Sequence, residues 1–216
     1  MKKNQKNYIK YIILFFLLLL FISISAFSYV DAVSTNISDS VFRLHVIANS
    51  NSEADQELKL KIRDRIIEYM NTICNGINTK SEVIDLAQNH LEEFNQIAKK
   101  VIVDSGFDYN VSASIGNFKF PTKVYGDIAL PAGFYDALKI EIGKASGQNW
   151  WCVMFPPLCF ADVSSGVVPE ESKKIMQDEL SDEEYYIISE KKPDIKFKFK
   201  LLEIFSSMTN TFTAKK

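Results

Sequence analysis

The N-terminal segment constrains this chain more than any other part of its sequence. No residue from Tyr11 to Val30 is charged, and this run is preceded by Lys2, Lys3, Lys6 and Lys10. A basic start followed by an apolar stretch is typical of an export signal. About 20 apolar residues are also enough to cross a bilayer as a helix, with the basic end on the cytoplasmic side. We therefore expect the rest of the chain to be exported.

Two exits from the apolar run carry small residues that a signal peptidase could use, Ala26–Ser28 and Val30–Ala32. Cleavage at either exit would release the rest of the chain, whereas a retained segment would hold it at the membrane through Tyr11–Val30. The sequence leaves both possibilities open. In either case residues 1–32 are expected to be a signal peptide or membrane anchor that stands apart from the folded domain.

The remaining chain has the size and charge of one ordinary domain. About 180 residues are enough for a hydrophobic core of their own. The whole chain has a net charge of −2, and because the N-terminal segment is basic, the exported part is more acidic than the whole. Binding to nucleic acid needs clustered positive charge. We therefore expect no nucleic-acid partner.

The first part of the domain predicts a strand followed by a helix. Residues 41–48 (VFRLHVIA) are apolar and β-branched, which favours a strand. One face of this strand carries Leu44, Val46 and Ala48, and the other carries Arg43, His45, Ile47 and Asn49. Ser52 is a typical N-cap, and apolar residues repeat at helical spacing up to Ile73. Along this helix Asp55, Lys59 and Arg63 predict a solvated charged side.

A second helix and a set of strands follow. Residues 81–103 have one continuous apolar side and predict a single long helix that Gly106 would end. The segments after it predict extended pieces at 109–115 and 118–125, a loop at 126–133, and strands at 135–142 and 149–155. Because helix and strand signals are segregated, we expect an α+β domain over residues 33–168, with a strand, two long helices and a mainly antiparallel sheet.

Residues 169–216 form a more charged C-terminal extension. Residues 170–180 and 182–186 predict weakly patterned helices, and 191–193 predict a linker. In Ile195–Leu201 apolar residues alternate with lysines. This pattern fits an edge strand or an element at a membrane surface, and its period of two favours the edge strand, where lysines commonly prevent unwanted pairing.

The stretch NWWCVMFPPLCF, residues 149–160, is the most unusual in the chain. In an oxidising compartment Cys152 and Cys159 are expected to form a disulfide, which would stabilise the fold by about 2–3 kcal/mol. Two buried free thiols are the alternative. A metal site is not expected, because Cys-x6-Cys is a loose spacing and no histidine-rich partner lies nearby. On a strand, Trp150 and Trp151 would point to opposite faces.

Two polar residues give weak evidence for catalysis. His45 could act as a general base, but a hydrogen-bonded structural histidine is an equally good explanation. Asp104-Ser-Gly106 is similar to the catalytic triplet of aspartic proteases, but that chemistry needs two carboxylates, and the triplet falls where the second helix should end. We therefore predict no catalytic residue, no metal, no cofactor and no small-molecule substrate.

Two long patterns go further than these arguments. HVIANS-x-S-x-x-DQ-x-LK-x-x-x-RD lies within residues 42–70, and G-x-NWWCV-x-FPPLC lies within residues 131–160. In this order behind an export segment, they resemble the stage II sporulation protein R family of endospore-forming Firmicutes. The resemblance covers residues 41–160. Asn51 departs from the family, which more often has Asp there, and the departure leaves the helix cap intact.

The resemblance implies a signalling protein and not an enzyme. Family members are exported from the forespore into the space between the two septal membranes. There they activate a membrane-embedded aspartic protease that processes the precursor of sigma-E. Candidate partner-binding residues, taken from the two matching segments, are Arg43, His45, Asn49, Asp55, Trp150, Trp151, Pro156 and Pro157.

Two other hypotheses stay open at this point. One is an exported cell-wall or peptide hydrolase that uses His45 or Asp104. The other is a structural septal protein anchored through Tyr11–Val30. Loss of activation without loss of secretion in a tryptophan variant would favour the signalling protein over both.

Overall fold

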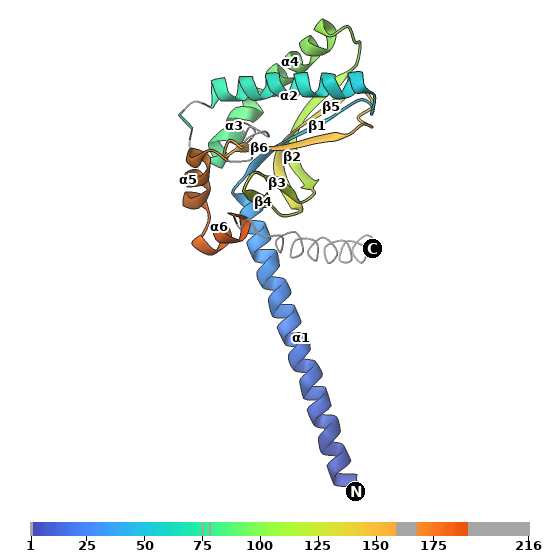
Figure 1. The fold of residues 1–216 in the computed structure, drawn as a ribbon, viewed down its shortest axis with the longest axis vertical. Coiled ribbons are helices and arrows are strands. Elements are labelled where there is room, and N and C mark those ends of the chain that lie inside the picture. The colour runs from blue at the N-terminus through green and yellow to red at the C-terminus, as the bar shows by residue number, and fades with distance from the viewer. Residues whose placement is uncertain (1, 75, 78, 159–167, 190–216) are drawn as a thin grey trace. The chain divides into compact units, whose positions relative to one another are not determined.

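The computed structural model describes residues 2–74, 76–77, 79–158 and 168–189 (Figure 1). The chain divides into two units, Met1–Asn36 and Ile37–Lys216. Among the described residues, the first unit lies within one helix, and the second holds the strands and the other helices. The fold class is therefore α+β behind an N-terminal apolar segment, as the sequence predicts.

The N-terminal helix α1 (Lys2–Asp39) carries the apolar run. Its window Tyr8–Ala26 has a mean hydropathy of 2.5, and no part of that window is buried. By length and composition it is the one helix among the described residues that could cross a membrane. A cleaved export signal has the same properties, so α1 is consistent with either role.

Four strands form the main sheet in the order β2-β5-β1-β6, where β1 is Phe42–Ile47, β2 is Val111–Phe120, β5 is Gly133–Ile142 and β6 is Asn149–Phe155. β2 pairs antiparallel with β5, and β6 pairs antiparallel with β1. The central pair, β1 and β5, is parallel. The sheet is therefore mainly antiparallel, as predicted, and the long stretch between β1 and β5 supplies the crossover that a parallel pair requires.

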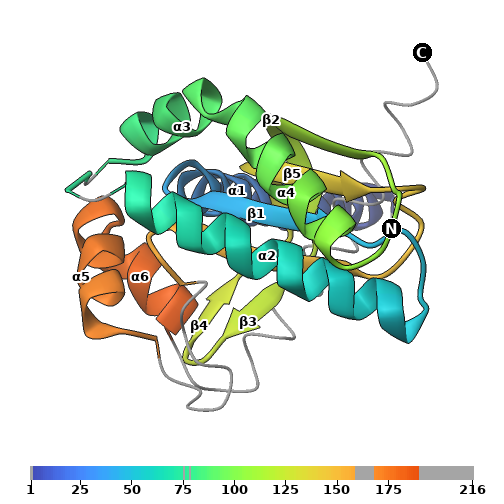
Figure 2. The ribbon, with the colours of Figure 1, turned by 90° about the horizontal axis from the view of Figure 1, so that it is seen from above.

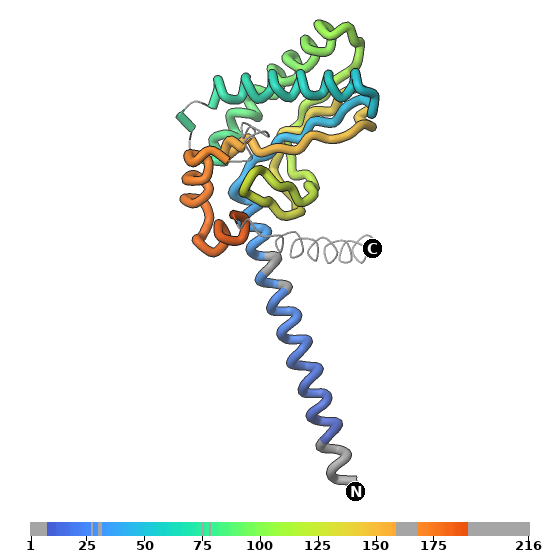
Figure 3. The backbone as a smooth tube through the Cα atoms, in the orientation of Figure 1, coloured from blue at the N-terminus to red at the C-terminus, as the bar shows by residue number. Residues whose placement is uncertain are grey.

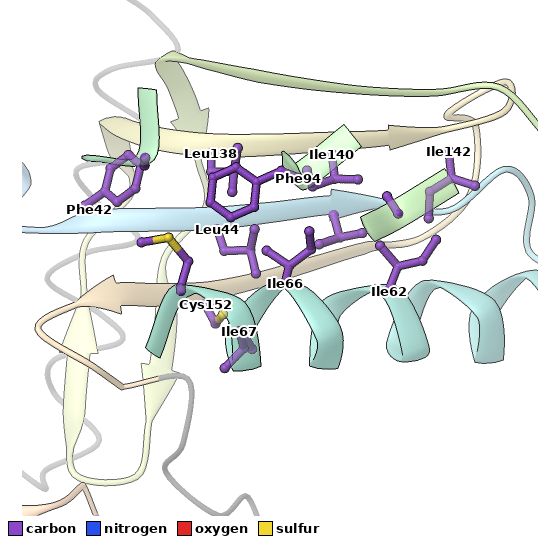
Figure 4. Close-up of a cluster of buried hydrophobic side chains, with 14 of the residues drawn as sticks. Phe42, Leu44, Ile62, Ile66, Ile67, Phe94, Leu138, Ile140, Ile142 and Cys152 are labelled. Atoms are coloured by element: carbon purple, nitrogen blue, oxygen red, sulfur yellow. The ribbon is translucent and has the colours of Figure 1, made fainter. Parts of the chain in front are cut away.

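Three helices lie between β1 and β2 in the chain: α2 (Glu53–Ile73), α3 (Lys80–Asn89) and α4 (Leu91–Asp104). The Ser52 hydroxyl accepts a hydrogen bond from the Asp55 N–H at 3.2 Å and so caps α2 as predicted. The ribbon seen from above and the tube both show α2 and α4 over one face of the sheet (Figures 2 and 3). The hydrophobic core fills this layer and includes Leu44, Ile62, Ile66, Phe94, Leu138, Ile140, Ile142 and Cys152 (Figure 4).

The helix predicted as one segment over residues 81–103 is broken at His90, so that prediction was wrong. His90 has φ −105° and ψ 19°, which ends α3 and precedes the first residue of α4. Its Nδ1 lies 2.7 Å from the Tyr69 hydroxyl on α2, which holds the break against that helix. Val83 of α3 and Phe94 of α4 both face the core, so periodicity alone indicated one continuous helix.

The other face of the sheet is met by a hairpin of β3 (Lys123–Tyr125) and β4 (Ile128–Leu130). The prediction of a loop over residues 126–133 was wrong, because all three residues of β4 are buried in strand conformation. Gly126 and Pro131, which flank β4, are typical of a loop, and a strand of three residues is too short to give a pattern of its own. β2 is likewise one continuous strand where two extended pieces were predicted.

Two short helices complete the described chain, α5 (Glu170–Glu179) and α6 (Asp182–Ser189), close to the predicted bounds. Lys173 of α5 forms an ion pair of 2.8 Å with Asp127 in the β3–β4 turn. The Ser172 hydroxyl donates to the Pro157 carbonyl at 2.8 Å. Residues 168–189 thus pack on the second unit, whereas the predicted linker 191–193 and the segment Ile195–Leu201 lie outside the described residues. The domain boundary at residue 168 stays a prediction.

Candidate partner-binding site

The two sequence patterns meet at one corner of the sheet, where β1 leads into α2 and β5 turns into β6. The Asn49 side-chain oxygen accepts from the Lys144 N–H at 2.9 Å, and the Asn51 side-chain oxygen accepts from the Gln148 N–H at 2.8 Å. The Gly147 N–H donates to the Ala48 carbonyl at 2.9 Å. The corner is therefore built from hydrogen bonds between segments nearly a hundred residues apart in sequence.

Asp55 lies inside this corner and is only 3% exposed. Its Oδ2 accepts from the Asn49 amide at 2.9 Å and from the Ser50 hydroxyl at 2.5 Å. Burial alone would raise the pKa of the Asp55 carboxyl, but these hydrogen bonds and those from other neighbours outweigh it and lower the pKa. Asp55 and Asn49, two of the candidate partner-binding residues, thus direct their polar atoms into the protein.

The prediction of a solvated charged side on α2 was wrong for Lys59. Its side chain is buried, and its Nζ donates to the Gln56 side-chain oxygen at 2.6 Å and to the Gln148 carbonyl at 3.2 Å. Desolvation lowers the pKa of the Lys59 ammonium. Lys59 therefore faces the β5–β6 turn and Asp55 faces the segment between β1 and α2, and a helix-period argument had no means of placing either neighbour.

Two glycines allow the segments to approach each other in the corner. A Cβ on Gly147 would lie 2.2 Å from the Ser50 carbonyl oxygen. Gly143 has φ +58°, and a Cβ there would lie 2.3 Å from the Asn49 side-chain oxygen. These contacts explain why the pattern around the β5–β6 turn needs residues without a side chain.

Arg43 lies on the opposite face of β1 from Leu44 and is fully buried, with 0% exposed. Its Nη2 donates to the Tyr125 hydroxyl at 2.6 Å, and its guanidinium lies 4.1 Å from the Phe120 ring centroid and 4.6 Å from that of Tyr135. Among the described residues no atom accepts from Nε or Nη1. A buried guanidinium over aromatic rings holds the hairpin to the sheet. The Arg43 side chain could contact a partner directly only if the hairpin and the sheet separated.

His45 lies next to Arg43 on the same face and is 7% exposed. Its ring stacks on Trp151 with centroids 3.7 Å apart, and its Nε2 lies 2.8 Å from the Asn149 side-chain oxygen. Burial, the largest effect, lowers the pKa of His45 to about 4, although the Asn149 hydrogen bond opposes the shift. His45 is therefore neutral at physiological pH and orients Trp151.

The tryptophans project to opposite faces of β6, as predicted. Trp151 is half-buried over His45 and Phe120, with its ring 4.7 Å from the Phe120 centroid. Trp150 is half-buried beneath Arg63 of α2, whose guanidinium lies 4.2 Å from the indole centroid. Both tryptophans lie on β6, which is an edge strand, and therefore at the same margin of the sheet.

The turn after β6 begins with a cis peptide bond between Phe155 and Pro156. Pro156 is buried and Pro157 is half-buried. Cys152 is buried in the core, but its expected partner Cys159 lies outside the described residues, so the disulfide stays a prediction. Cys74 is a half-buried free thiol whose pKa is raised by desolvation.

The sequence model of the stage II sporulation protein R family matches residues 38–165. This chain belongs to that family. The stage II sporulation protein R of Bacillus subtilis (strain 168) is 39% identical over 137 residues, which is 63% of this chain and 61% of that protein. The chain thus matches less than two thirds of that relative's length. No solved structure matches the chain.

The residues of the two sequence patterns form the corner between β1 and α2 and the edge strand β6. Sequence reasoning named Arg43, His45 and both tryptophans as candidates, but it did not name Phe120, Tyr125 and Tyr135, which surround Arg43. In the sequence only their aromatic character distinguishes these three residues. The packing of the hairpin on the sheet brings Tyr125 to the guanidinium that Phe120 and Tyr135 already contact. Asp104, the other catalytic candidate, is the last residue of α4. No group of acidic, histidine or cysteine residues among those described could hold a metal ion.

Proposed function

We propose that this chain is an exported sporulation signalling protein that activates a membrane-embedded aspartic protease by protein–protein contact, so that the protease processes the precursor of sigma-E. The observation that carries this proposal is the family match over residues 38–165, which covers the main sheet and its three covering helices. The apolar helix α1 supports export from the forespore into the septal intermembrane space, either as a secreted or as an anchored protein.

The mechanism we propose is a population shift. The exported domain binds the active arrangement of the protease more tightly than the inactive one and so raises its population. A change from 1:99 to 99:1 needs about 5.5 kcal/mol of differential affinity. Aromatic residues that become fully desolvated in an interface are the commonest source of such affinity.

The contact surface we propose is the β6 margin, defined here as Asn149, Trp150, Trp151 and Pro157. Asn149 is exposed, and the other three are half-buried, so each offers surface that a partner can desolvate. Arg43, His45, Asn49 and Asp55 are positioning residues in this proposal. His45 contacts Trp151 and Asn149 directly, Arg43 holds the hairpin to the sheet beside His45, and Asn49 and Asp55 hold the corner between β1 and α2. Pro156 is buried and fixes the turn at its end.

The test replaces the gene in sporulating cells with tryptophan variants and measures processing of the sigma-E precursor together with a sigma-E-dependent reporter. Trp150→Ala and Trp151→Ala should remain secreted at normal levels and lower processing by about tenfold or more. Trp151→Phe keeps a ring over His45, so it separates loss of contact from loss of the stack. Phe134→Ser, on an exposed residue outside the margin, is the matched control. Full processing with both alanine variants would refute this surface.

A further inference from the structure

The main sheet has two edge strands, and the structure treats them differently. On β6 the outward Trp151 carbonyl accepts from the Tyr125 hydroxyl at 3.1 Å. The outward Val153 carbonyl accepts from the Leu158 N–H at 3.2 Å. A further strand on β6 would need these carbonyls as acceptors, so the two hydrogen bonds close this edge.

The β2 edge is open over its second half. The Asn110 carbonyl accepts from the Gly143 N–H at 2.7 Å, and the register of β2 with β5 then directs the backbone groups of odd-numbered residues in β2 outward. The Ala113 N–H agrees with this assignment, because it donates outward to the Asn95 side-chain oxygen at 2.7 Å. Beyond Ala113 the outward groups have no partner among the described residues, and they belong to Ile115, Asn117 and Lys119.

The open stretch is symmetric about Asn117. Towards the start of β2 it is limited by Ala113, whose N–H is already used. Towards the end it is limited by Pro121, which follows the last residue of β2 and has no N–H to donate. An antiparallel strand related to β2 by a twofold axis at Asn117 therefore places Ile115 opposite Lys119 and the used Ala113 N–H opposite Pro121. Each free N–H of the stretch then meets a free carbonyl.

We propose that β2 is a dimerisation edge, at which two copies of this chain pair antiparallel through residues 115–119 about a twofold axis at Asn117. The symmetry of the open stretch favours a second copy over a strand of another protein, because only self-pairing requires the free groups to be centred on one residue. The two sheets would become one, with the helices of both copies on the same face. This inference goes beyond the proposed function and does not depend on the protease being the partner.

The side chains of β2 fit this register. On the face away from the helices, Phe118 of each copy lies opposite Gly116 of the other. The Phe118 ring already leans over its own Gly116, since a Cβ there would lie 3.2 Å from Phe118 Cζ, so the two rings would meet over the two glycines. On the helix face, Ile115 lies opposite the aliphatic stem of Lys119. The two Lys119 residues lie about 14 Å apart along the strands, so like charges are not opposed.

Neighbouring elements leave this edge accessible. The β3–β4 hairpin, which follows Pro121, reaches back beneath its own sheet, where Tyr125 bonds to Arg43 of β1 and to Trp151 of β6. α4 lies on the opposite face, and its Asn95 bonds to the edge outside the open stretch. So short a pairing buries less than the ~800 Å² per partner of a stable complex, and the dimer should therefore dissociate on dilution.

Disulfide cross-linking of the full chain tests both the pairing and its register. All variants carry Cys74→Ser, which removes the free thiol among the described residues, and they are oxidised in detergent at several micelles per chain. Asn117→Cys should form linked dimers at least about tenfold faster than Ser112→Cys, because residues opposite each other at the axis lie about 5.5 Å apart, within the range of a disulfide. Ser112 is exposed on the same strand and is the matched control.

The register predicts a further result. Ile115→Cys mixed with Lys119→Cys should form the mixed dimer. Either variant alone should link no faster than Ser112→Cys, since its two copies lie about 14 Å apart along the strands. Equal rates for Asn117→Cys and Ser112→Cys would overturn the proposal. Preferential linking of Ile115→Cys to itself would also overturn it, because that result requires another register.

Amide hydrogen exchange, followed by NMR, gives a readout without introduced cysteines. Protection of the Ile115 and Lys119 amides should rise by about tenfold or more as the unaltered chain passes from mostly monomer to mostly dimer. Asn117→Ala, which loses the side-chain bond to Asp136 but keeps the N–H, should behave in the same way. Asn117→Pro lacks the N–H at the axis but keeps the ladder to β5, and its protection should not rise.

The inward amides of β2 provide the folding control. The Ser114 and Gly116 amides, which face β5, should stay protected in every variant and at every concentration. Outward amides that remain unprotected at high concentration would contradict the dimer. Protection that is independent of concentration would contradict it too, because a cover supplied by the same chain does not respond to dilution.

Discussion

The imidazole of His45 lies almost parallel to the indole of Trp151, with ring centroids 3.7 Å apart and an angle of 18° between the planes. The pairing of β1 with β6 places the two residues opposite each other, and Phe120 meets the His45 ring from another side. Burial in this stack is what lowers the pKa of His45 to about 4. A neutral histidine therefore supports the tryptophan that we place at the contact surface.

The His45 stack predicts how stability depends on pH. Because the folded-state pKa of about 4 lies below the ordinary histidine value of 6.5, the unfolded chain binds this proton more readily. The contribution is fully present above pH 6.5 and is lost as the pH falls towards 4. The free energy of unfolding should decline by at most about 1.4 kcal/mol per pH unit in this window. Urea unfolding across it should show a flatter dependence for His45→Phe, and an unchanged slope would contradict the assigned cause.

The Arg43–Tyr125 hydrogen bond predicts a coupled effect on stability. Tyr125→Phe leaves Nη2 of Arg43 and the Trp151 carbonyl without the hydroxyl, so it should destabilise the fold by about 1–3 kcal/mol. Arg43→Met removes a buried charge that has no ion-pair partner among the described residues. It should therefore destabilise the fold less than removing one member of a buried ion pair usually does.

A double-mutant cycle checks this coupling. Tyr125→Phe should cost clearly less in the Arg43→Met background, because one of the two groups that it leaves unpaired is already gone. Chemical denaturation of the four proteins gives the coupling free energy. Additive effects would show that Tyr125 and Arg43 do not hold the hairpin together.

Gly147 should be the least replaceable glycine in the corner. A Cβ there would lie 2.2 Å from backbone, the Ser50 carbonyl oxygen, so Gly147→Ala should cost about 3 kcal/mol or more by moving α2 away from the β5–β6 turn. Gly106→Ala is the matched control, because φ +82° strains the residue but nothing lies within 4 Å of its Cβ. It should cost only about 1 kcal/mol. Similar melting temperatures for the two variants would contradict this account of the corner.

Local patterns were enough to predict the elements that depend on neighbouring residues. The Ser52 cap, the end of α2 at Ile73 and the bounds of β6 follow from hydrogen bonding and periodicity within a few residues. The α+β class follows in the same way from the segregation of helix and strand signals. The opposite orientations of Trp150 and Trp151 need only the geometry of a strand.

Features that depend on distant contacts were missed. His90 ends the first part of the predicted helix where its ring contacts Tyr69. β4 forms a strand because its three apolar residues are buried in the folded protein. The helix pattern predicted a solvated Lys59, but its ammonium donates to the Gln148 carbonyl of the β5–β6 turn. Arg43 was a candidate because it lies in a segment that matches the family, and such a match does not show that a hairpin covers the residue.

Activation by contact predicts that the two catalytic candidates can be replaced. Asp104→Asn should leave sigma-E precursor processing within about twofold of normal, because Asp104 ends a helix and no proposed contact uses it. His45→Phe should retain most of the activity, since a ring still supports Trp151. Loss of an essential acid or base would instead lower a hydrolase reaction by about 100-fold or more. Processing is measured in sporulating cells, with the amount of exported protein as the control. Asp104→Asn removes the carboxylate and leaves the β6 margin in place. A collapse of processing with this variant at normal protein levels would therefore mean that chemistry, and not contact, carries the signal.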